Sequence, residues 1–385
     1  MNVYCDSAAT TRPYDDVVVA VANTMKDIYG NPSSEHRVGS EAADALRKAR
    51  HQIAMLLGAR DSEIYFTSGA SESNNWAIQS VMREQAKHGK RYIITSEFEH
   101  HSVLNTVDEL AYNGINPLYL RPDSSGFIDP RDVEDLLDKY KGKVGLVSIM
   151  FVNNELGTIQ PITQIADVCH AHGVLFHVDA TQAVGHIHVD VTAYGMDMMS
   201  FSAHKFHGPR GVGGLYIRSG VDVNSFIFGG KQERGSRAGT ENLPGIVGMA
   251  VALDISDSHI VLYNNRTIRI RNWMAEELSD IDGAHLNGAL SSHVPGILNF
   301  TFDNVEGESL LLMLDTYGIS ASAGSACATG MVESSHVLRS IGCTKEQAMC
   351  SIRLSFDADM TFEQAAYVVD TIKKCVAILR NAVEK

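Results

Sequence analysis

Four separate stretches of the chain carry side chains suited to amine, acid–base and sulfur chemistry. Lys205 lies in SFSAHKFHG, Asp179 in HVDATQ, His100 in SEFEHHSVL and Cys327 in SASAGSACATG. A lysine whose pKa is lowered by burial is an amine nucleophile. A buried aspartate requires a cationic partner, which a protonated pyridine nitrogen would supply. A cysteine thiolate attacks sulfur and carbon electrophiles.

Each of these residues also has an ordinary structural interpretation. Lys205 could be a solvated surface residue, as most lysines are. Asp179 could form a buried salt bridge or cap a helix, and Cys327 could be a structural core cysteine. His100 and the adjacent His101 could both lie at the surface. Taken singly, these residues do not decide between the two interpretations.

The stretch FTSGASESNNW, residues 66–76, predicts an anion site. An apolar run ends at a Ser-Gly-Ala-Ser turn, and a helical pattern begins there. Backbone N–H groups at such a helix start, together with Ser71, suit a phosphate. The alternative is a plain serine cap with a glutamate as its capping partner. With an amine, a carboxylate and an imidazole at other strand ends, the phosphate interpretation predicts a pyridoxal phosphate site.

The elements that must position these groups alternate between strand and helix. Short β-branched and aromatic runs predict buried strands: EIYFTSG, RYIITSE, VGLVSIMFVNNE, GVLFHVDA, MDMMSFSAHK and VGGLYIR. Helical spacing lies between some of them, in SESNNWAIQSVMREQAKHG and in ITQIADVCHAHG, which closes on Gly173. This alternation predicts an α/β domain with a mostly parallel sheet and a ligand site beyond the carboxyl ends of its strands.

After about residue 255 the pattern changes. A helical stretch, TIRIRNWMAEELSD, precedes the strand-like runs VPGILNFTFD and SIRLSFD, and TFEQAAYVVDTIKKCVAILRNAVEK predicts a last helix. We therefore expect a large cofactor-binding domain over 12–255. The smaller domain is expected to combine 1–11 with 256–385 and to carry the cysteine loop at about 318–334.

Bulk composition excludes several classes of protein. The formal net charge is −14, from 32 basic and 46 acidic residues, which disfavours a nucleic-acid binder. The start of the chain has no signal-peptide pattern, and no apolar run of membrane-spanning length is present. The six cysteines form no CxxC pair, so neither a metal site nor a disulfide framework is expected. We expect a reduced, cytoplasmic protein.

Eleven motifs in order resemble the cysteine desulfurases of the NifS/IscS type, in the class V aminotransferase group of fold-type I pyridoxal phosphate enzymes. The motifs are YCDSAATT, GNPSSEH, TSGASESNN, EHHSVL, VNNELGTIQPI, HVDATQAVG, SFSAHKFHGPRGVGGLY, ERGSRAGTEN, GSACATG, SSHVLRSIG and SIRLSF. The resemblance implies a large domain with a mostly parallel seven-stranded sheet flanked by helices, plus a smaller α+β domain. It also implies removal of sulfur from L-cysteine, with L-alanine as the other product.

The resemblance assigns cofactor roles residue by residue. Lys205 would hold pyridoxal phosphate as a Schiff base, and Asp179 would pair with the ring nitrogen. Gln182 would bind the phenolic oxygen, and His100 would stack on the ring and handle protons near the substrate thiol. The phosphate ligands would be Ala70, Ser71, Ser202 and His204, with Thr240 contributed by the other subunit of a homodimer.

The remaining roles concern the substrate and the sulfur. Asn154 would bind near the cofactor and, with Arg353, hold the substrate carboxylate, for which the planar arginine fork is suited. Cys327 would accept the sulfur as a persulfide. Small neighbouring residues would let its loop move. The extended loop motif favours delivery to a protein acceptor for iron–sulfur cluster or other thio-cofactor synthesis.

Departures from the common family pattern remove no catalytic group. Ser71 replaces a usual Thr, Ala203 replaces a frequent Gly, and Lys231 interrupts a Gly-rich run. The chain also stops soon after its last predicted helix, so the identity of the sulfur acceptor is left undecided. Three alternatives remain: a selenocysteine lyase, a class V aminotransferase, or a non-catalytic sulfur-relay protein. The first would reject cysteine, the second would not need Cys327, and the third would have lost Lys205 or Asp179.

Overall fold

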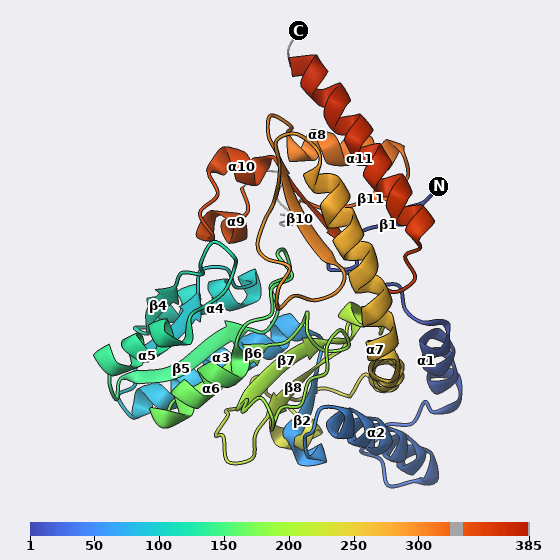
Figure 1. The fold of residues 1–385 in the computed structure, drawn as a ribbon. Coiled ribbons are helices and arrows are strands. Elements are labelled where there is room, and N and C mark those ends of the chain that lie inside the picture. The colour runs from blue at the N-terminus through green and yellow to red at the C-terminus, as the bar shows by residue number, and fades with distance from the viewer. Residues whose placement is uncertain (324–333, 384–385) are drawn as a thin grey trace.

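The computed structural model describes residues 1–323 and 334–383, so Cys327 lies outside the described residues. Its largest element is a seven-stranded sheet of order β2-β8-β7-β6-β5-β3-β4 (Figure 1). The strands are β2 (Ile64–Thr67), β3 (Tyr92–Ser96), β4 (Asn116–Leu120), β5 (Val144–Met150), β6 (Leu175–Asp179), β7 (Met198–Ser202) and β8 (Gly213–Ile217). The five strands from β4 to β7 pair in parallel, and β8 runs antiparallel to β7 and β2. The predicted mostly parallel sheet is confirmed.

Helices cover both faces of this sheet, which explains why most residues of its strands are buried. One face packs against α3 (Ala70–Lys87) and α4 (His101–Tyr112), whose side chains form a core with β3 and β8. The other carries α5 (Pro130–Lys139) and α6 (Ile162–Ala171), which contribute to a second core. Every residue of β5, β7 and β8 is buried, as expected of strands covered on both sides.

A smaller unit lies above the large sheet in Figure 1. It contains an antiparallel sheet of β9 (Ala284–Leu286), β10 (Ile297–Phe302) and β12 (Ser351–Ser355). The N-terminal strand β1 (Val3–Tyr4) joins this unit by pairing with β11 (Ile319–Ser320). The helices α8 (Gly307–Thr316), α9 (His336–Ser340), α10 (Lys345–Met349) and α11 (Phe362–Val383) complete it.

One long helix, α7 (Leu243–Ser279), connects the two units. Its first half packs against α1 (Asp15–Asp27) and α2 (Arg37–Leu56), and its second half packs against α11 (Figure 1). By length and composition alone α7 could cross a membrane. However, Ile246 and Met249 belong to the large core and Met274 and Leu278 to the small one, so α7 is a core helix. The predicted domain boundary at residue 255 lies inside this helix, and the division into two domains stays a prediction.

Candidate active site

The predicted polar residues gather at the carboxyl edge of the large sheet. Asp179 is the last residue of β6, and Lys205 ends a short 3-10 turn that follows β7 directly. His100 is the N-cap of α4 after β3, and Asn154 follows β5. Because parallel strands end at one edge, four residues that are far apart in sequence meet there.

The amine of Lys205 is held by the N-terminal segment of the chain. Its Nζ donates to the carbonyl oxygens of Ala8 and Ala9, at 2.6 and 3.0 Å. Gln182 Nε2 donates to the same Ala8 oxygen at 2.8 Å. Burial, helped by the positive charge of Arg353, lowers the pKa of Lys205 to about 8. About a tenth of this amine is therefore in the neutral, nucleophilic form at pH 7, far more than for an ordinary lysine.

Asp179 is buried without a cationic partner among the described residues. It is 5% exposed, and its oxygens accept from Asn74 Nδ2 at 2.7 Å and from the backbone N–H of Thr181 at 3.0 Å. These neutral donors do not balance the charge of a buried carboxylate. Neither the salt bridge nor the helix cap considered from the sequence is formed. The carboxylate therefore fits the protonated nitrogen of a pyridine ring.

The start of α3 fits an anion. Its N-cap is Gly69, at φ +154°, and no side chain caps the helix. A Cβ at this position would stand 3.4 Å from Ser202 Oγ, so the hydroxyl of Ser202 faces the helix start. Ser71 is exposed and does not cap the helix, in contrast to the simple capping alternative. Exposed backbone N–H groups at a helix start and a nearby hydroxyl suit a phosphate.

His204 and Thr240, the other predicted phosphate ligands, are placed differently. The Nδ1 of His204 lies 3.2 Å from Thr10 Oγ1, and burial lowers the pKa of His204 to about 4. A neutral imidazole of this kind binds a phosphate only through a hydrogen bond. Thr240 is exposed on the loop that follows Arg237, and Arg237 pairs with Glu72 in the first turn of α3 at 2.8 Å. Thr240 therefore faces outward from this chain.

Arg353 reaches from the small sheet to the end of β5. Its Nη1 donates to the carbonyl oxygen of Asn154 at 2.9 Å, and its Nη2 lies 2.8 Å from Asp6 Oδ1. The residue is 3% exposed, and its Nε has no partner among the described residues. A buried guanidinium with a spare donor fits the carboxylate of an amino acid. Lys205 Nζ contacts Ala8 and Ala9, and Arg353 contacts Asp6, so the same short N-terminal segment joins the amine and the guanidinium.

Several groups at the site had no role assigned from the sequence. Asp6 lies in the motif YCDSAATT, where a charged residue directly after the apolar Cys5 was an available signal. Asn74 lies on the face of α3 that meets Asp179, and its burial could not be told from the pattern SESNNW. The Ala8 carbonyl carries no side-chain signal at all. Cys5, next to the same segment, is fully buried, and burial raises the pKa of its thiol to about 12.

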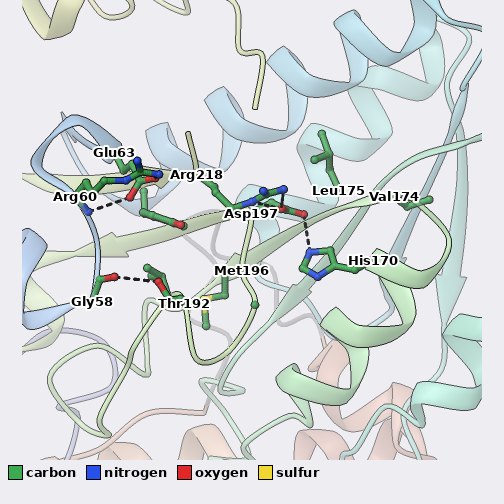
Figure 2. A pocket seen from close by; sticks show the side chains of 14 residues that line it. Gly58, Arg60, Glu63, His170, Val174, Leu175, Thr192, Met196, Asp197 and Arg218 are labelled. Atoms are coloured by element: carbon green, nitrogen blue, oxygen red, sulfur yellow. Dashed lines mark hydrogen bonds and ion pairs between the residues drawn. The ribbon is translucent and has the colours of Figure 1, made fainter. Parts of the chain in front are cut away.

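A separate hollow of about 630 Å³ lies at the opposite edge of the large sheet, where β6 begins and β8 ends (Figure 2). Arg218 Nε and His170 Nε2 both reach Asp197 there, at 2.7 and 3.3 Å. Arg60 pairs with Glu63 at 3.1 Å. The charges in this hollow are matched within the protein, and among the described residues none of the predicted site residues lines it. It has no part in the chemistry below.

Comparison with known proteins identifies the family of this chain. Residues 3–368 match the family model described as Aminotransferase class-V. The chain belongs to this family. It is 42% identical over 379 residues to a protein named cysteine desulfurase IscS from Methanosarcina thermophila, which covers 98% of this chain and 93% of the relative. A relative of the same name from Dictyoglomus turgidum is 43% identical over 381 residues, or 99% of this chain and 96% of that one.

Solved structures of the family share the fold over nearly the whole chain. A NifS-like protein superimposes with a TM-score of 0.92 at 38% identity, covering 98% of this chain and all of the other. A protein named SspA, in complex with cysteine, gives a TM-score of 0.81 at 34% identity over 94% of this chain and all of the other. The fold class predicted from the sequence is confirmed.

Proposed function

We propose that this chain is a cysteine desulfurase that transfers the sulfur of L-cysteine to Cys327 and releases L-alanine. The observation that carries the proposal is the convergence of Lys205, Asp179 and Arg353 at one edge of the sheet, in a chain more than 40% identical to proteins of that name. In the reaction, the Cβ–Sγ bond of the substrate breaks and a bond forms between that sulfur and the Cys327 sulfur. Cβ takes up a proton, so thiol and cysteine yield persulfide and alanine.

Pyridoxal phosphate would suit this site: the start of α3 would hold its phosphate, Asp179 would pair with its ring nitrogen, and the Lys205 amine would bind its carbonyl carbon. When bound, it supplies an electron sink that weakens the bonds at the substrate Cα. Gln182, whose Nε2 donates to the same Ala8 carbonyl oxygen as Lys205 Nζ, would bind its phenolic oxygen. The other residues at the site act on the substrate itself.

Arg353 and Asn154 orient the substrate carboxylate, because the guanidinium is already fixed by the Asn154 carbonyl and has a spare Nε donor. The amine of Lys205, with its pKa lowered to about 8, can take and return a proton at Cα near neutral pH. Cys327 attacks the substrate sulfur as a thiolate. His100 lies at the same edge, where it would stack on the cofactor ring.

The decisive experiment compares native chain with Cys327→Ala, measuring alanine and sulfide formed from L-cysteine with a reductant. We expect equal amounts of both products from the native chain and almost none from the variant. Cys343→Ala is the matched control, because Cys343 is the half-buried thiol next to α9 and should be dispensable. A Cys327→Ala enzyme with full activity would instead favour a lyase or transaminase. Activity on selenocysteine but not on cysteine would favour the selenocysteine lyase.

We further propose that the enzyme is a homodimer in which Thr240 completes the phosphate site of the other subunit. Exposure of Thr240 and of Phe228, which is 83% exposed on the same loop, supports this proposal. Mixing Lys205→Ala subunits with Thr240→Asp subunits tests it. A mixed dimer then has one site with both native residues, so activity should return on mixing. If Thr240 serves its own subunit, no activity returns.

The sulfur acceptor is proposed to be a protein, and the compartment is proposed to be the cytoplasm. The extended motif around Cys327 supports a protein acceptor, and six cysteines without a disulfide-framework spacing support a reducing compartment. Chain loaded with labelled sulfur and separated from free cysteine should pass the label to an added iron–sulfur scaffold or sulfurtransferase protein. Release of all the label as free sulfide in the presence of such proteins would contradict a protein acceptor.

A further inference from the structure

A continuous series of hydrogen bonds links Asp179 to His100 beneath the site. Asn74 Nδ2 lies 2.7 Å from Asp179 Oδ2 and 2.9 Å from Ser102 Oγ. Ser102 Oγ in turn lies 2.8 Å from His100 Nδ1. The backbone N–H of Ser102 also points at that ring nitrogen, at 3.0 Å. Two helices supply the connection, since Asn74 is on α3 and Ser102 is in the first turn of α4.

The direction of each hydrogen bond follows from chemistry. Asp179 can only accept as a carboxylate, so the Asn74 amide must turn its NH₂ group toward Asp179; the reverse orientation would set oxygen against oxygen. The second proton of that group goes to Ser102 Oγ. A backbone N–H can only donate, so His100 Nδ1 must be an acceptor. The Ser102 hydroxyl, already accepting from Asn74, then donates its own proton to the same nitrogen.

We infer that Asn74 and Ser102 are positioning residues that hold His100 as the tautomer with its proton on Nε2. A neutral imidazole carries one proton, and Nδ1 is occupied by two donors, so the proton must be on Nε2. His100 therefore offers a hydrogen-bond donor to the substrate before it can accept a proton. A role for this tautomer in sulfur transfer rests on the proposed function. The position of the proton on Nε2 does not rest on it.

The charges around His100 agree with a neutral ring. The residue is partly exposed to solvent, but the protein packed behind it disfavours the charged form and lowers the pKa of His100. Asp179 opposes this effect. Lys205, His101 and His336 act in the same direction as the burial, because each is a cation or a potential cation. The geometry of the Nδ1 contacts, however, is what selects the tautomer.

The tautomer can be measured by ¹⁵N NMR on the whole protein labelled at histidine. The signals of His100 are assigned by their loss in His100→Gln, and long-range proton–nitrogen correlations show which ring nitrogen carries the proton. We expect a protonated Nε2 and an unprotonated Nδ1 at neutral pH. A proton on Nδ1, or a cationic ring, would overturn the inference. If the native chain had no desulfurase activity, the proposed function would be wrong, but the measured tautomer of His100 would be unaffected.

A pair of variants tests the role of the Ser102 hydroxyl. Ser102→Ala removes one of two donors to Nδ1, so protonation of that nitrogen becomes easier and the pKa of His100 should rise. One net hydrogen bond corresponds to a shift of roughly half a unit to one unit. Thr106→Val is the matched control, because Thr106 Oγ1 donates to the Ser102 carbonyl at 2.8 Å and does not touch the imidazole. An unchanged pKa in Ser102→Ala, or an equal shift in Thr106→Val, contradicts the role given to Ser102.

Discussion

Arg353 and Asp6 form an ion pair at the site, with Arg353 Nη2 2.8 Å from Asp6 Oδ1. The guanidinium side chain is 3% exposed and the carboxylate side chain 25% exposed, so Asp6 is the partner nearer to solvent. Asp6 follows β1, and Arg353 lies on β12, which shows how the N-terminal segment reaches the site through the small sheet. A negative charge thus stands beside the group that is proposed to bind the substrate carboxylate.

Substitutions at this pair should change the KM for L-cysteine in opposite directions. Arg353→Lys removes the planar fork and should raise the KM, with a loss in kcat/KM of roughly tenfold to a hundredfold, since a hydrogen bond to a charged group is worth about 1.5–3 kcal/mol. Asp6→Asn keeps an acceptor but removes a charge that repels the substrate carboxylate, so the KM should fall. Steady-state kinetics at one pH measures both. A rise in KM for Asp6→Asn would show that Asp6 orients Arg353 instead.

The pH dependence of cofactor uptake should follow the Lys205 amine. Only the neutral amine attacks a carbonyl carbon, and burial sets the pKa of Lys205 at about 8. In cofactor-free chain, the rate of covalent pyridoxal phosphate uptake should therefore rise with pH, with a midpoint near pH 8, and level off at higher pH. Stopped-flow absorbance measures the rate, and Lys205→Ala provides the baseline. A midpoint near 10.5, the ordinary lysine value, would show that the amine is solvated.

The positions of these residues at strand ends could be predicted because parallel strands follow a simple sequence rule. Apolar runs that end in polar residues mark the carboxyl edge of a sheet, and this placed Lys205, Asp179 and His100 correctly. The family motifs identified Arg353. Its contact with Asn154 could not be predicted, because the two residues lie far apart in the sequence. These two sources named the side chains that are proposed to act on the cofactor and the substrate, but not Asp6 or Asn74.

The partners of those side chains could not be predicted, because they depend on contacts between distant segments. Asp6 and Arg353 are 347 positions apart, and Ala8 meets Lys205 across 197 positions through a carbonyl oxygen that has no sequence signature. The continuity of α7 was missed for a different reason. Its first half and its second half face two different cores, so a single helical periodicity does not run through it.

Glu99 should be a neutral acid at neutral pH, with a measurable effect on stability. It is fully buried, Oε1 accepts from Ser96 Oγ and the Met150 N–H, and Oε2 has no partner among the described residues. Burial raises the pKa of Glu99 to about 8. The folded state therefore binds a proton between about pH 4.5 and 8 that the unfolded state has lost, so this group lowers the stability as the pH rises through that window.

Glu99→Gln removes that titration while keeping an acceptor for both donors. We expect the variant to unfold at nearly the native denaturant concentration at pH 5 and at a higher one than the native chain at pH 8.5. Urea unfolding of the cofactor-free chains at both pH values measures the difference. A difference that does not change with pH would mean that Glu99 is ionised in the folded state or titrates alike in both states.

A buried ion pair should anchor the loop that carries Thr240. Glu233 forms a bidentate ion pair with Arg50, whose Nη2 and Nη1 lie 2.7 and 2.8 Å from the Glu233 carboxylate oxygens. The carboxylate also accepts a hydrogen bond from the Phe66 N–H at 3.0 Å. Its side chain is 2% exposed. Glu233 and the next residue, Arg234, both have positive φ, at 44° and 57°, a conformation that costs non-glycine residues free energy. The ion pair is thus what holds a strained turn against β2.

Glu233→Ala should destabilise the protein strongly, because it leaves the nearly buried Arg50 guanidinium without a counter-charge. Breaking such a pair costs about 3–5 kcal/mol. Glu41→Ala is the matched control: its pair with Arg37, at 2.6 Å, is exposed on α2 and should be worth roughly 0–1 kcal/mol. Urea unfolding compares the two variants. Equal losses would mean that the turn is held by its other contacts, including Arg234 on the Ile64 carbonyl and over the Tyr65 ring.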